Sequence, residues 1–424
     1  MPGKKKGKGK GKGKGKGKGK GKGKGKKSVQ SRDLVVMKNL LKQYDRNCVF
    51  TGSQPSASIR HIIKECIEQE KCLSKFILES ANPEPEHPVL VEPLLVAFRQ
   101  IRYDQMKDLH IWNYPMSYEN CASLALLLEK PFCNIRLLEL VDCLIEAYSI
   151  NRLAKCFSSN QNLTTLNLDY NEFGDTGVMY LCQGLQDNSS VLSLSLCFCG
   201  LGIPSGRLLG KLISTTAVRE LYLDGNDLEC EGTLELIKLP VDQAEMEAFH
   251  RAQIVRLAEE EKLRKLEEEK TNRFKAGTSG ESSTEDGGKS SNTSKKKKKG
   301  KKKKSKGPPA PPPIGPWIHK LHLADNGIDG MGNKGTFAPV IVMRLFKKLL
   351  AHSMCLEELD LEDNLIGDLG GQELKNALTL RKEAKLPSVK IRTTHRMSPN
   401  IFNSIVKLGS GLSKKKKKGK KKKK

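Results

Sequence analysis

Aromatic and acidic side chains recur at fixed positions of a repeated apolar pattern in this sequence. Tyr170 and Phe198 each stand seven residues after the start of such a unit, so we expect them to be neighbours on one surface. Aromatic side chains often anchor protein interfaces, and nearby carboxylates steer a basic partner towards them. The alternative is a merely soluble face, because single exposed apolar residues are common. The residues predicted to bind a protein partner are Trp112, Asp169, Tyr170, Phe198, Glu220, Tyr222, Asp224, Glu358, Asp360, Glu362 and Asp363.

No arrangement of residues typical of a catalytic centre occurs in the sequence. The eight histidines are dispersed, and neither an H-E-x-x-H motif, a G-x-S-x-G motif nor a paired-carboxylate motif is present. The alternating Gly and Lys near the N-terminus lack the spacing and the Ser or Thr of a phosphate-binding loop. We therefore predict a binding protein without enzymatic activity, cofactor or metal site.

The twelve cysteines are scattered, and none forms a C-x-x-C pair. No apolar signal sequence precedes them, so we expect reduced thiols in an intracellular protein. No stretch is long and apolar enough to predict a membrane span. Cys143 and Cys199 stand where other units of the pattern have Asn, and we predict that they are buried in that turn rather than bound to metal.

Lysine is concentrated in three segments. The chain has a formal net charge of +27, and residues 4–27, 295–306 and 414–424 hold 34 lysines and no acids, so the remainder carries −7. Lysine runs attract any polyanion, but without arginine or interleaved aromatics they do not read bases. We predict binding to an acidic polymer, with tubulin tails ahead of RNA, DNA or anionic lipid. Nuclear import, or docking of an arm on the chain's own acidic face, are alternatives. The predicted polyanion-binding residues include Lys295, Lys299, Lys301, Lys414, Lys418 and Lys424.

Short strands must position the predicted binding residues. The stretch Leu163–Phe173 reads L-x-x-L-x-L-x-x-N-x-F, and its residues Leu166 and Leu168 alternate, so both point to one face of a strand. Asn171 comes where the strand turns away, and its amide can bond to backbone groups that the turn leaves unpaired. One unit cannot bury its own leucines without neighbours. Units of this kind start at residues 106, 135, 163, 191, 218, 318 and 356, and a degenerate eighth reads Leu386-x-x-Val389-x-Ile391.

The spacing of the first five units is 27–29 residues, which leaves room for a helix after each strand. In this pattern the chain resembles the ribonuclease-inhibitor type of leucine-rich-repeat protein. The resemblance implies an α/β solenoid, or horseshoe, of about eight repeats whose parallel strands form a concave, protein-binding face. Similar chains with lysine-rich extensions belong to motile cilia and sperm. This implies a cytoplasmic scaffold, with the axoneme and its microtubules as a candidate location.

Two other function classes share the repeat type. Ran-type GTPase-activating proteins are similar in the solenoid, but they carry a long acidic tail where this chain has basic ones. A nuclear or RNA-associated protein, similar to ribonuclease inhibitor in its acidic face, would use the lysines to bind polyanions.

The segments outside the repeats differ in composition. Apolar residues at helical spacing predict helices over Asp33–Tyr44, from Ile59 onwards through Ile77, and over Leu94–Ile101, as a cap or a separate binding domain. A charged helix over Asp242–Phe274, with a coiled coil as alternative, begins an insertion that continues into a lysine run and a Pro-rich spacer or SH3-type ligand. The predicted segments are a disordered tail (1–27), an N-terminal helical cap (28–105), repeats 1–5 (106–239), the insertion (240–316), repeats 6–8 (317–397), a closing helix (398–412) and a disordered tail (413–424).

Overall fold

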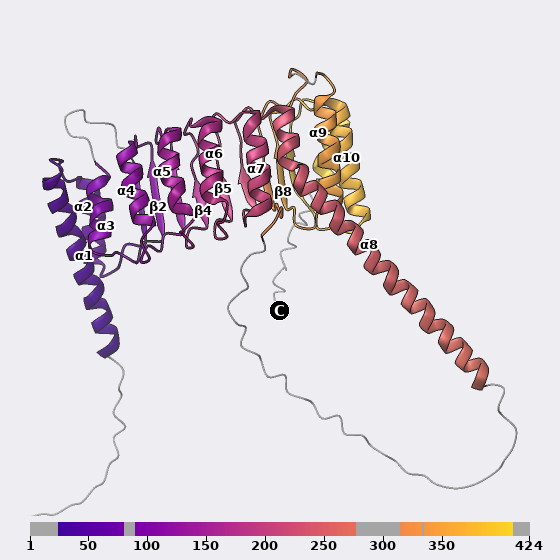
Figure 1. Cartoon of the computed structure of the whole chain (residues 1–424), viewed down its shortest axis with the longest axis horizontal. Coiled ribbons are helices and arrows are strands. Elements are labelled where there is room, and N and C mark those ends of the chain that lie inside the picture. The colour runs from indigo at the N-terminus through magenta and orange to yellow at the C-terminus, as the bar shows by residue number, and fades with distance from the viewer. Residues whose placement is uncertain (1–23, 80–89, 277–313, 333–334, 410–424) are drawn as a thin grey trace, which may run out of the picture. The chain divides into compact units, whose positions relative to one another are not determined.

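The computed structural model describes residues 24–79, 90–276, 314–332 and 335–409 (Figure 1). It divides into two compact units. Of the described residues, 24–74 and 90–105 belong to the first unit, and the remainder belong to the second. The lysines predicted to bind polyanions, together with the Pro-rich spacer at 308–313, lie outside the described residues.

In the described residues of the first unit there are three helices: α1 (Lys24–Phe50), α2 (Ala57–Glu68) and α3 (Glu92–Gln100). The Ser56 side chain caps α2 by accepting from the backbone N–H of Ile59, and the Ser56 N–H donates to the Tyr44 hydroxyl at 2.9 Å. These bonds satisfy polar groups where the chain reverses between α1 and α2. A helix is present at each of the three predicted places, but α2 ends at Glu68 rather than continuing through Ile77, and α1 begins at Lys24, inside the segment 1–27 that was predicted to be disordered.

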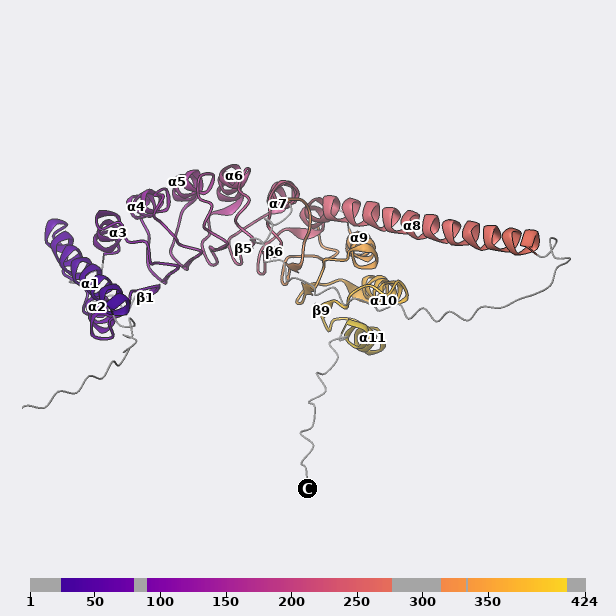
Figure 2. The same ribbon diagram turned by 90° about the horizontal axis from the view of Figure 1, so that it is seen from below.

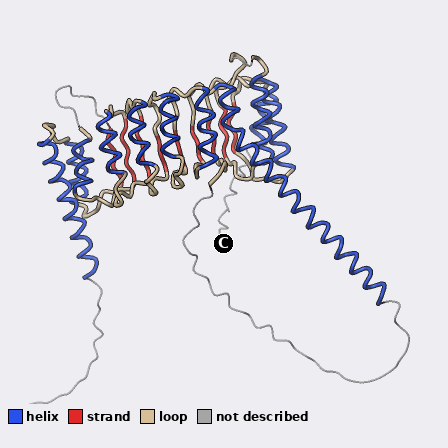
Figure 3. Tube along the Cα trace, in the orientation of Figure 1, coloured by secondary structure: helices blue, strands red, loops and turns tan. Residues whose placement is uncertain are grey.

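The second unit contains nine parallel strands, in chain order, within one sheet of the described residues (Figure 3). Helices alternate with the strands and cover one face of this sheet, which leaves the other face open (Figure 2). The strands are β1 (Lys75–Glu79), β2 (Asp108–Trp112), β3 (Leu137–Val141), β4 (Thr165–Asn167), β5 (Ser193–Ser195), β6 (Glu220–Tyr222), β7 (Lys320–His322), β8 (Glu358–Leu361) and β9 (Lys390–Thr393). The helices are α4 (Tyr118–Leu128), α5 (Ala147–Phe157), α6 (Gly174–Leu185), α7 (Ile203–Thr215), α8 (Glu229–Ala276), α9 (Ala338–His352), α10 (Gly367–Glu383) and α11 (Pro399–Gly409).

The leucines of the pattern form the core of this unit. The central leucine of each unit pairs with that of the next, as Leu166 does with Leu138 and Leu194. These side chains are buried under the helices. Burial of one leucine contributes about 1.5–3 kcal/mol, and adjacent repeats supply the neighbours that a single unit lacks. The prediction of parallel strands with leucines on one face is confirmed.

The Asn of the pattern bonds to the backbone of two repeats at once. The Asn171 side chain is fully buried. Its Oδ1 accepts from the N–H groups of Cys143 and Ile145, at 3.0 and 3.1 Å. Its Nδ2 donates to the carbonyls of Leu140 and Leu168, both at 2.8 Å. This confirms the predicted role of Asn171, and it shows that the bonds also tie neighbouring repeats together.

Two predictions about the edges of the sheet are wrong. The segment from Leu73 to Ile77 was expected to continue a helix, but Lys75–Glu79 forms β1, in which Phe76 pairs with Leu109. The degenerate eighth unit is displaced by two residues, because Ile391 pairs with Leu359 and so takes the place assigned to Val389. Since side chains alternate along a strand, a shift of two residues keeps the apolar side inward and leaves no trace in the pattern.

The charged helix of the insertion is not separate from the repeats. Helix α8 runs without interruption from Glu229, the start of the fifth repeat's helix, to Ala276, with Pro240 inside it. Its first part packs on α9, where Arg251 Nη2 donates to the His352 carbonyl at 2.6 Å. From Ala252 to Thr271 every residue is exposed, and this part extends past the repeats (Figure 1). The helix predicted at 242–274 is therefore present, but its start is wrong. Within the described residues, no helix has the length and apolar character needed to span a membrane.

Candidate functional site

Two stacked aromatic rings lie in the loops that follow β4 and β5. The rings of Tyr170 and Phe198 lie 4.7 Å apart between centroids and 9° from parallel, as expected from their shared position in the repeat. The two side chains are 52 % and 42 % exposed. Their backbone N–H groups donate to the Cys197 and Asp224 carbonyls of the next repeats, at 2.8 and 2.9 Å. Two large rings are thus held rigidly at the surface.

Gly225 continues the row of residues to which Tyr170 and Phe198 belong, and it makes space for the Phe198 ring. Its φ is +69°, and a Cβ added there would lie 2.1 Å from Phe198 Cε1. An alanine at this position would have to push the ring aside. The flat contact between Phe198 and its neighbours therefore depends on this glycine.

At the β2–β3 end of the open face, Glu139 joins two aromatic groups. Its Oε2 lies 2.6 Å from His110 Nδ1 and accepts from Trp112 Nε1 at 3.0 Å. The His110 and Trp112 rings meet edge to face at 5.4 Å between centroids. Trp112 was predicted as a binding residue, whereas His110 and Glu139 were not among the predicted set.

Several predicted acids on the open face are already engaged within the chain. Asp169 Oδ1 accepts from the Ser195 hydroxyl and the Cys197 N–H, both at 2.7 Å. Burial raises the pKa of Asp169, although these hydrogen bonds oppose the shift. Asp224 Oδ1 accepts from the Ala324 N–H at 2.8 Å. These two carboxylates join adjacent repeats and are half-buried, so they are poorly placed to meet a partner.

Basic residues of β7 pair with the acids of β6. Lys320 Nζ lies 2.8 Å from Glu220 Oε1, and the Tyr222 hydroxyl donates to the same carboxylate at 3.3 Å. The Tyr222 ring meets the His322 ring edge to face, with centroids 4.7 Å apart. Burial raises the pKa of Glu220, but hydrogen bonding and the charge of Lys320 lower it further, so the net shift is downward.

Basic residues of β9 pair with the acids of β8 in the same way. Glu358 Oε1 lies 2.5 Å from Lys390 Nζ and 3.2 Å from Arg392 Nη2. Asp360 Oδ2 lies 3.0 Å from Arg392 Nε, and His322 Nε2 lies 3.5 Å from Glu358 Oε1. This part of the open face is therefore a mixed-charge network rather than an acidic patch, which corrects the expected carboxylate surface here. If the sequence analysis had assigned the eighth unit its observed register, it would have predicted that Lys390 and Arg392 lie beside Glu358 and Asp360.

Exposed acids of the predicted set remain at the ends of the strands. Glu362 and Asp363 are exposed in the loop that follows β8. Asp363 shares the repeat position of Tyr170 and Phe198, and it also has a positive φ, of 56°. Of the predicted partner-binding residues, the structure leaves the Tyr170–Phe198 pair, Glu362 and Asp363 most available.

Comparison with known proteins agrees with this architecture. The family described as Leucine Rich repeat matches residues 159–182 and 352–375. Human NACHT, LRR and PYD domains-containing protein 12 is 39 % identical over 103 residues, which is 24 % of this chain and 10 % of that protein. Proteins 4B and 5 of the same name from Mus musculus are 32 % and 28 % identical, over 32 % and 45 % of this chain and 16 % of each relative. The chain thus contains leucine-rich repeats.

The chain spans a small part of the curated relatives it matches, between 7 % and 16 % of their length for those cited and for the similar rat proteins. The solved structure of Leiomodin-1 Actin-Binding Site 2 (ABS2) aligns with 40 % of this chain and 99 % of its own chain, at a TM-score of 0.32 and 18 % identity. At that score, nothing about function follows from the match.

Two cysteines are buried in the turns of their repeats. All twelve cysteines are free, and all lie within the described residues. Cys143 and Cys199 are fully buried, and their thiols donate weakly to the Ile111 and Leu168 carbonyls, both at 3.3 Å. Burial raises the pKa of Cys143 to about 12, so this thiol is protonated and unreactive at neutral pH. The predicted burial of both residues in the turn is confirmed.

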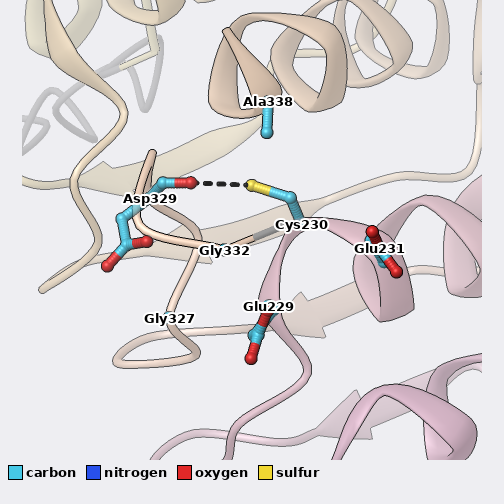
Figure 4. A pocket seen from close by; sticks show the side chains of 7 residues that line it. All are labelled: Glu229, Cys230, Glu231, Gly327, Asp329, Gly332 and Ala338. Carbon is cyan, nitrogen blue, oxygen red and sulfur yellow. Dashed lines mark hydrogen bonds between the residues drawn. The ribbon is translucent and has the colours of Figure 1, made fainter. Parts of the chain in front are cut away.

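A small cavity lies between the start of α8, the loop that follows β7 and the start of α9 (Figure 4). Its free volume is about 10 Å³, and its lining includes Glu229, Cys230 and Asp329. The Cys230 thiol donates to the Asp329 carbonyl at 3.2 Å, and burial raises the pKa of Cys230 to about 11. The space admits at most one water. Within the described part of the chain, no group of three or more His, Cys, Asp or Glu side chains could hold a metal ion.

Substitution of Gly225 by alanine should disturb the aromatic pair. The left-handed backbone costs an alanine about 1–2 kcal/mol, and the new methyl group must also displace the Phe198 ring. We expect a lower free energy of unfolding in urea and a changed near-ultraviolet circular dichroism signal. Gly200→Ala is the matched control, because Gly200 has a φ of +68° and no atom within 4 Å of an added Cβ. Equal effects of both changes would contradict the ring contact.

Substitution of Glu358 by glutamine should lower the free energy of unfolding, by an amount that depends on pH. Burial raises the pKa of Glu358, but Lys390 and then His322 and Arg392 lower it, and the net shift is downward. Its stabilisation is therefore complete above the ordinary glutamate pKa of about 4.3 and is lost as the pH falls through the lower folded value. We expect a loss of about 1–2 kcal/mol at pH 7 that shrinks in acid, measured by urea unfolding. Glu362→Gln, at an exposed position, should leave stability unchanged at both pH values.

Proposed function

We propose that this chain is a non-catalytic interaction scaffold of the ribonuclease-inhibitor type, whose open sheet face holds a segment of a protein partner. The observation that carries this proposal is the rigid, exposed stack of Tyr170 and Phe198. Exposed aromatic pairs suit the anchor role that a few residues play in most interfaces. The similarity of the repeats to those of other leucine-rich-repeat proteins supports a protein-interaction role.

The charge around the aromatic pair favours a basic partner segment. Glu172 lies two residues after Tyr170, and Asp227 stands in the next-but-one loop; both are exposed. Acids on the strands of the open face, such as Glu220, Glu358 and Asp360, form ion pairs with basic residues. The unpaired negative charge therefore lies mainly in the loops that follow the strands. Charge of opposite sign on the partner would raise its association rate and orient it on the face.

The lysine-rich segments provide a second binding activity in this proposal. They would hold the scaffold to an acidic polymer through salt-dependent attraction. We favour the acidic tails of tubulin in the cytoplasm, in particular in the axoneme of motile cilia. Co-sedimentation with microtubules before and after removal of the tubulin tails tests this part. We expect binding to be lost with the tails, and equal binding to both preparations would exclude tail recognition.

Replacement of both aromatic anchors tests the binding face directly. A displayed peptide library is selected on the full chain, and the selected peptides are then measured on Tyr170→Ser/Phe198→Ser. We expect Lys- and Arg-rich peptides whose affinity falls at least about 30-fold, because two anchor residues contribute roughly 2 kcal/mol or more.

The matched control is Tyr118→Ser/Tyr148→Ser. Tyr118 and Tyr148 also form an exposed stack, with centroids 5.1 Å apart, but they belong to the helical layer. Selected peptides that bind both double variants as well as the wild type would contradict the proposed site.

A further inference from the structure

The loops that follow strands β2 to β8 form one edge of the second unit and carry a pronounced negative charge, whereas the loop after β9 carries the exposed His395 and Arg396. We call this the acidic loop edge, and define it by residues 113–117, 142–146, 168–173, 196–202, 223–228, 323–332 and 362–366. These ranges contain no lysine, arginine or histidine; Lys334 follows the sixth and lies outside the described residues. Tyr170 and Phe198 stand in the middle of this edge. Its exposed acids are Asp142, Glu146, Glu172, Asp227, Asp325, Glu362 and Asp363.

The opposite edge of the same unit, where the chain enters the strands, carries charges of both signs. Lys107, Lys130 and Arg136 are exposed there, and so are Glu129, Asp187 and Glu357. At the acidic loop edge, by contrast, a lysine-rich segment meets negative charge without intervening basic residues. This difference directs such a segment to the loops that hold the aromatic pair.

The aromatic pair adds a contact that suits lysine in particular. The ring faces of tyrosine and phenylalanine attract an ammonium group that approaches within about 6 Å of the centroid. Tyr170 and Phe198 are about half exposed, and Glu172 beside them supplies a second, ionic contact. Nothing in the described part of the chain covers the two rings, so an occupant for this surface has to come from elsewhere.

The chain itself ends in a segment with the required chemistry. Residues 413–424 read Ser-Lys5-Gly-Lys5, and they follow α11, which ends at Gly409 beside the start of β9, where an added Cβ would meet Ile391. Strand β5 lies four strands from β9, about 20 Å at roughly 4.8 Å per strand. The 15 residues after Gly409 can extend to about 50 Å, which is enough to cross the strands and reach Phe198.

From these observations we infer that the C-terminal lysine segment, residues 413–424, docks on the acidic loop edge over Tyr170 and Phe198 and competes with basic partners. The inference rests on the proposed function, because it concerns regulation of the same face. Linkage to the same chain gives the segment a high effective concentration at the edge. A partner must then displace it, and capture of the segment by an acidic polymer would free the face.

The experiment compares the full chain with a chain that lacks residues 413–424, which retains every described element. A fluorescent peptide with the sequence of residues 413–424 is titrated against both, and binding is followed by anisotropy at several salt concentrations. We expect the peptide to bind the truncated chain at least 5-fold more tightly than the full chain, with the difference decreasing as salt rises. Equal affinity for both chains would overturn the inference.

Two further variants of the truncated chain locate the bound peptide. Tyr170→Leu/Phe198→Leu keeps apolar bulk but removes the ring faces, and it should weaken the peptide 3- to 10-fold. Tyr118→Leu/Tyr148→Leu removes the other exposed stack and should leave the affinity unchanged. Equal affinity of the wild-type truncated chain and the Tyr170→Leu/Phe198→Leu variant would overturn the inference, because the peptide would then bind elsewhere.

The outcomes separate this inference from the proposed function. If library-selected basic peptides require Tyr170 and Phe198 but bind the full and truncated chains equally, the proposed function stands and the inference is overturned. If the tail peptide docks on the two rings while no selected peptide depends on them, the inference stands and the proposed partner site fails.

Discussion

Replacement of Asn171 by alanine is expected to reduce the free energy of unfolding by about 3–5 kcal/mol. The side chain is fully buried and makes five hydrogen bonds to the backbone, two through Oδ1 and three through Nδ2. Alanine leaves the N–H groups of Cys143 and Ile145 without this acceptor. Each buried group that loses its partner costs about 1–3 kcal/mol, and water cannot readily enter this packed turn to replace the bonds.

Two comparisons make this prediction specific. Asn167→Ala removes one half-buried acceptor, for the Asp169 N–H at 2.8 Å, and should cost about 1 kcal/mol. Asn171→Cys should be milder than Asn171→Ala, because Cys143 and Cys199 at the same repeat position donate to equivalent carbonyls. Urea unfolding of the three variants provides the measurement. If Asn171→Ala lowered the free energy of unfolding no more than Asn167→Ala does, the hydrogen bonds of the Asn171 side chain would contribute little to stability.

Replacement of Arg381 by methionine is expected to have a cost of similar size, about 4 kcal/mol or more. The side chain is 3 % exposed, and its guanidinium donates to four backbone carbonyls. Nη1 donates to Leu350 and Ser353 at 2.7 and 2.6 Å, and Nε donates to Pro387 at 2.6 Å. Burial lowers the pKa of Arg381 to about 10, so it is charged at neutral pH. Methionine fills the space but leaves these carbonyls without a donor.

The effect should be confined to the region that Arg381 joins, which is the end of α9, the loop before β8 and the loop before β9. Hydrogen exchange should therefore accelerate around residues 350–356 before it accelerates in β4 or β5. Arg381→Lys should restore only part of the lost stability, because a single ammonium group cannot donate to all the carbonyls that the planar guanidinium reaches. Arg344→Met is the control, because Arg344 is 67 % exposed and its pair with Glu373 lies at the surface. If Arg381→Met and Arg344→Met lowered the free energy of unfolding equally, the proposed role of Arg381 in joining these three segments would be refuted.

The regular repeats could be predicted because their apolar residues obey one period. Leu166 and Leu168 alternate, and the same spacing recurs often enough to define the sheet and the side on which the helices lie. Strand β1 could not be predicted in this way. Residues 73–79 contain Leu73, Phe76 and Ile77, which fit a helical face as well as a strand, and a short apolar run does not separate the two.

The site was predictable to the extent that it depends on repeat position. Tyr170 and Phe198 were expected to be neighbours because equal positions in adjacent repeats meet across the sheet. The partners of Glu358 and Asp360 were not predicted, because Lys390 and Arg392 lie on a strand whose register was displaced by two residues. Nor could the sequence indicate that Arg381, an ordinary residue of a charged helix, would be buried and bound to four carbonyls.

The sequence by itself determined the repeat architecture, the buried leucines, the bonding role of Asn171 and the separation of charge between lysine-rich segments and an acidic body. These properties follow from period, composition and spacing along the chain. Only the tertiary structure decided which acids are free to meet a partner. That outcome depends on the distance between side chains on neighbouring strands, where Lys320, Lys390 and Arg392 neutralise one part of the open face and leave negative charge beside Tyr170 and Phe198.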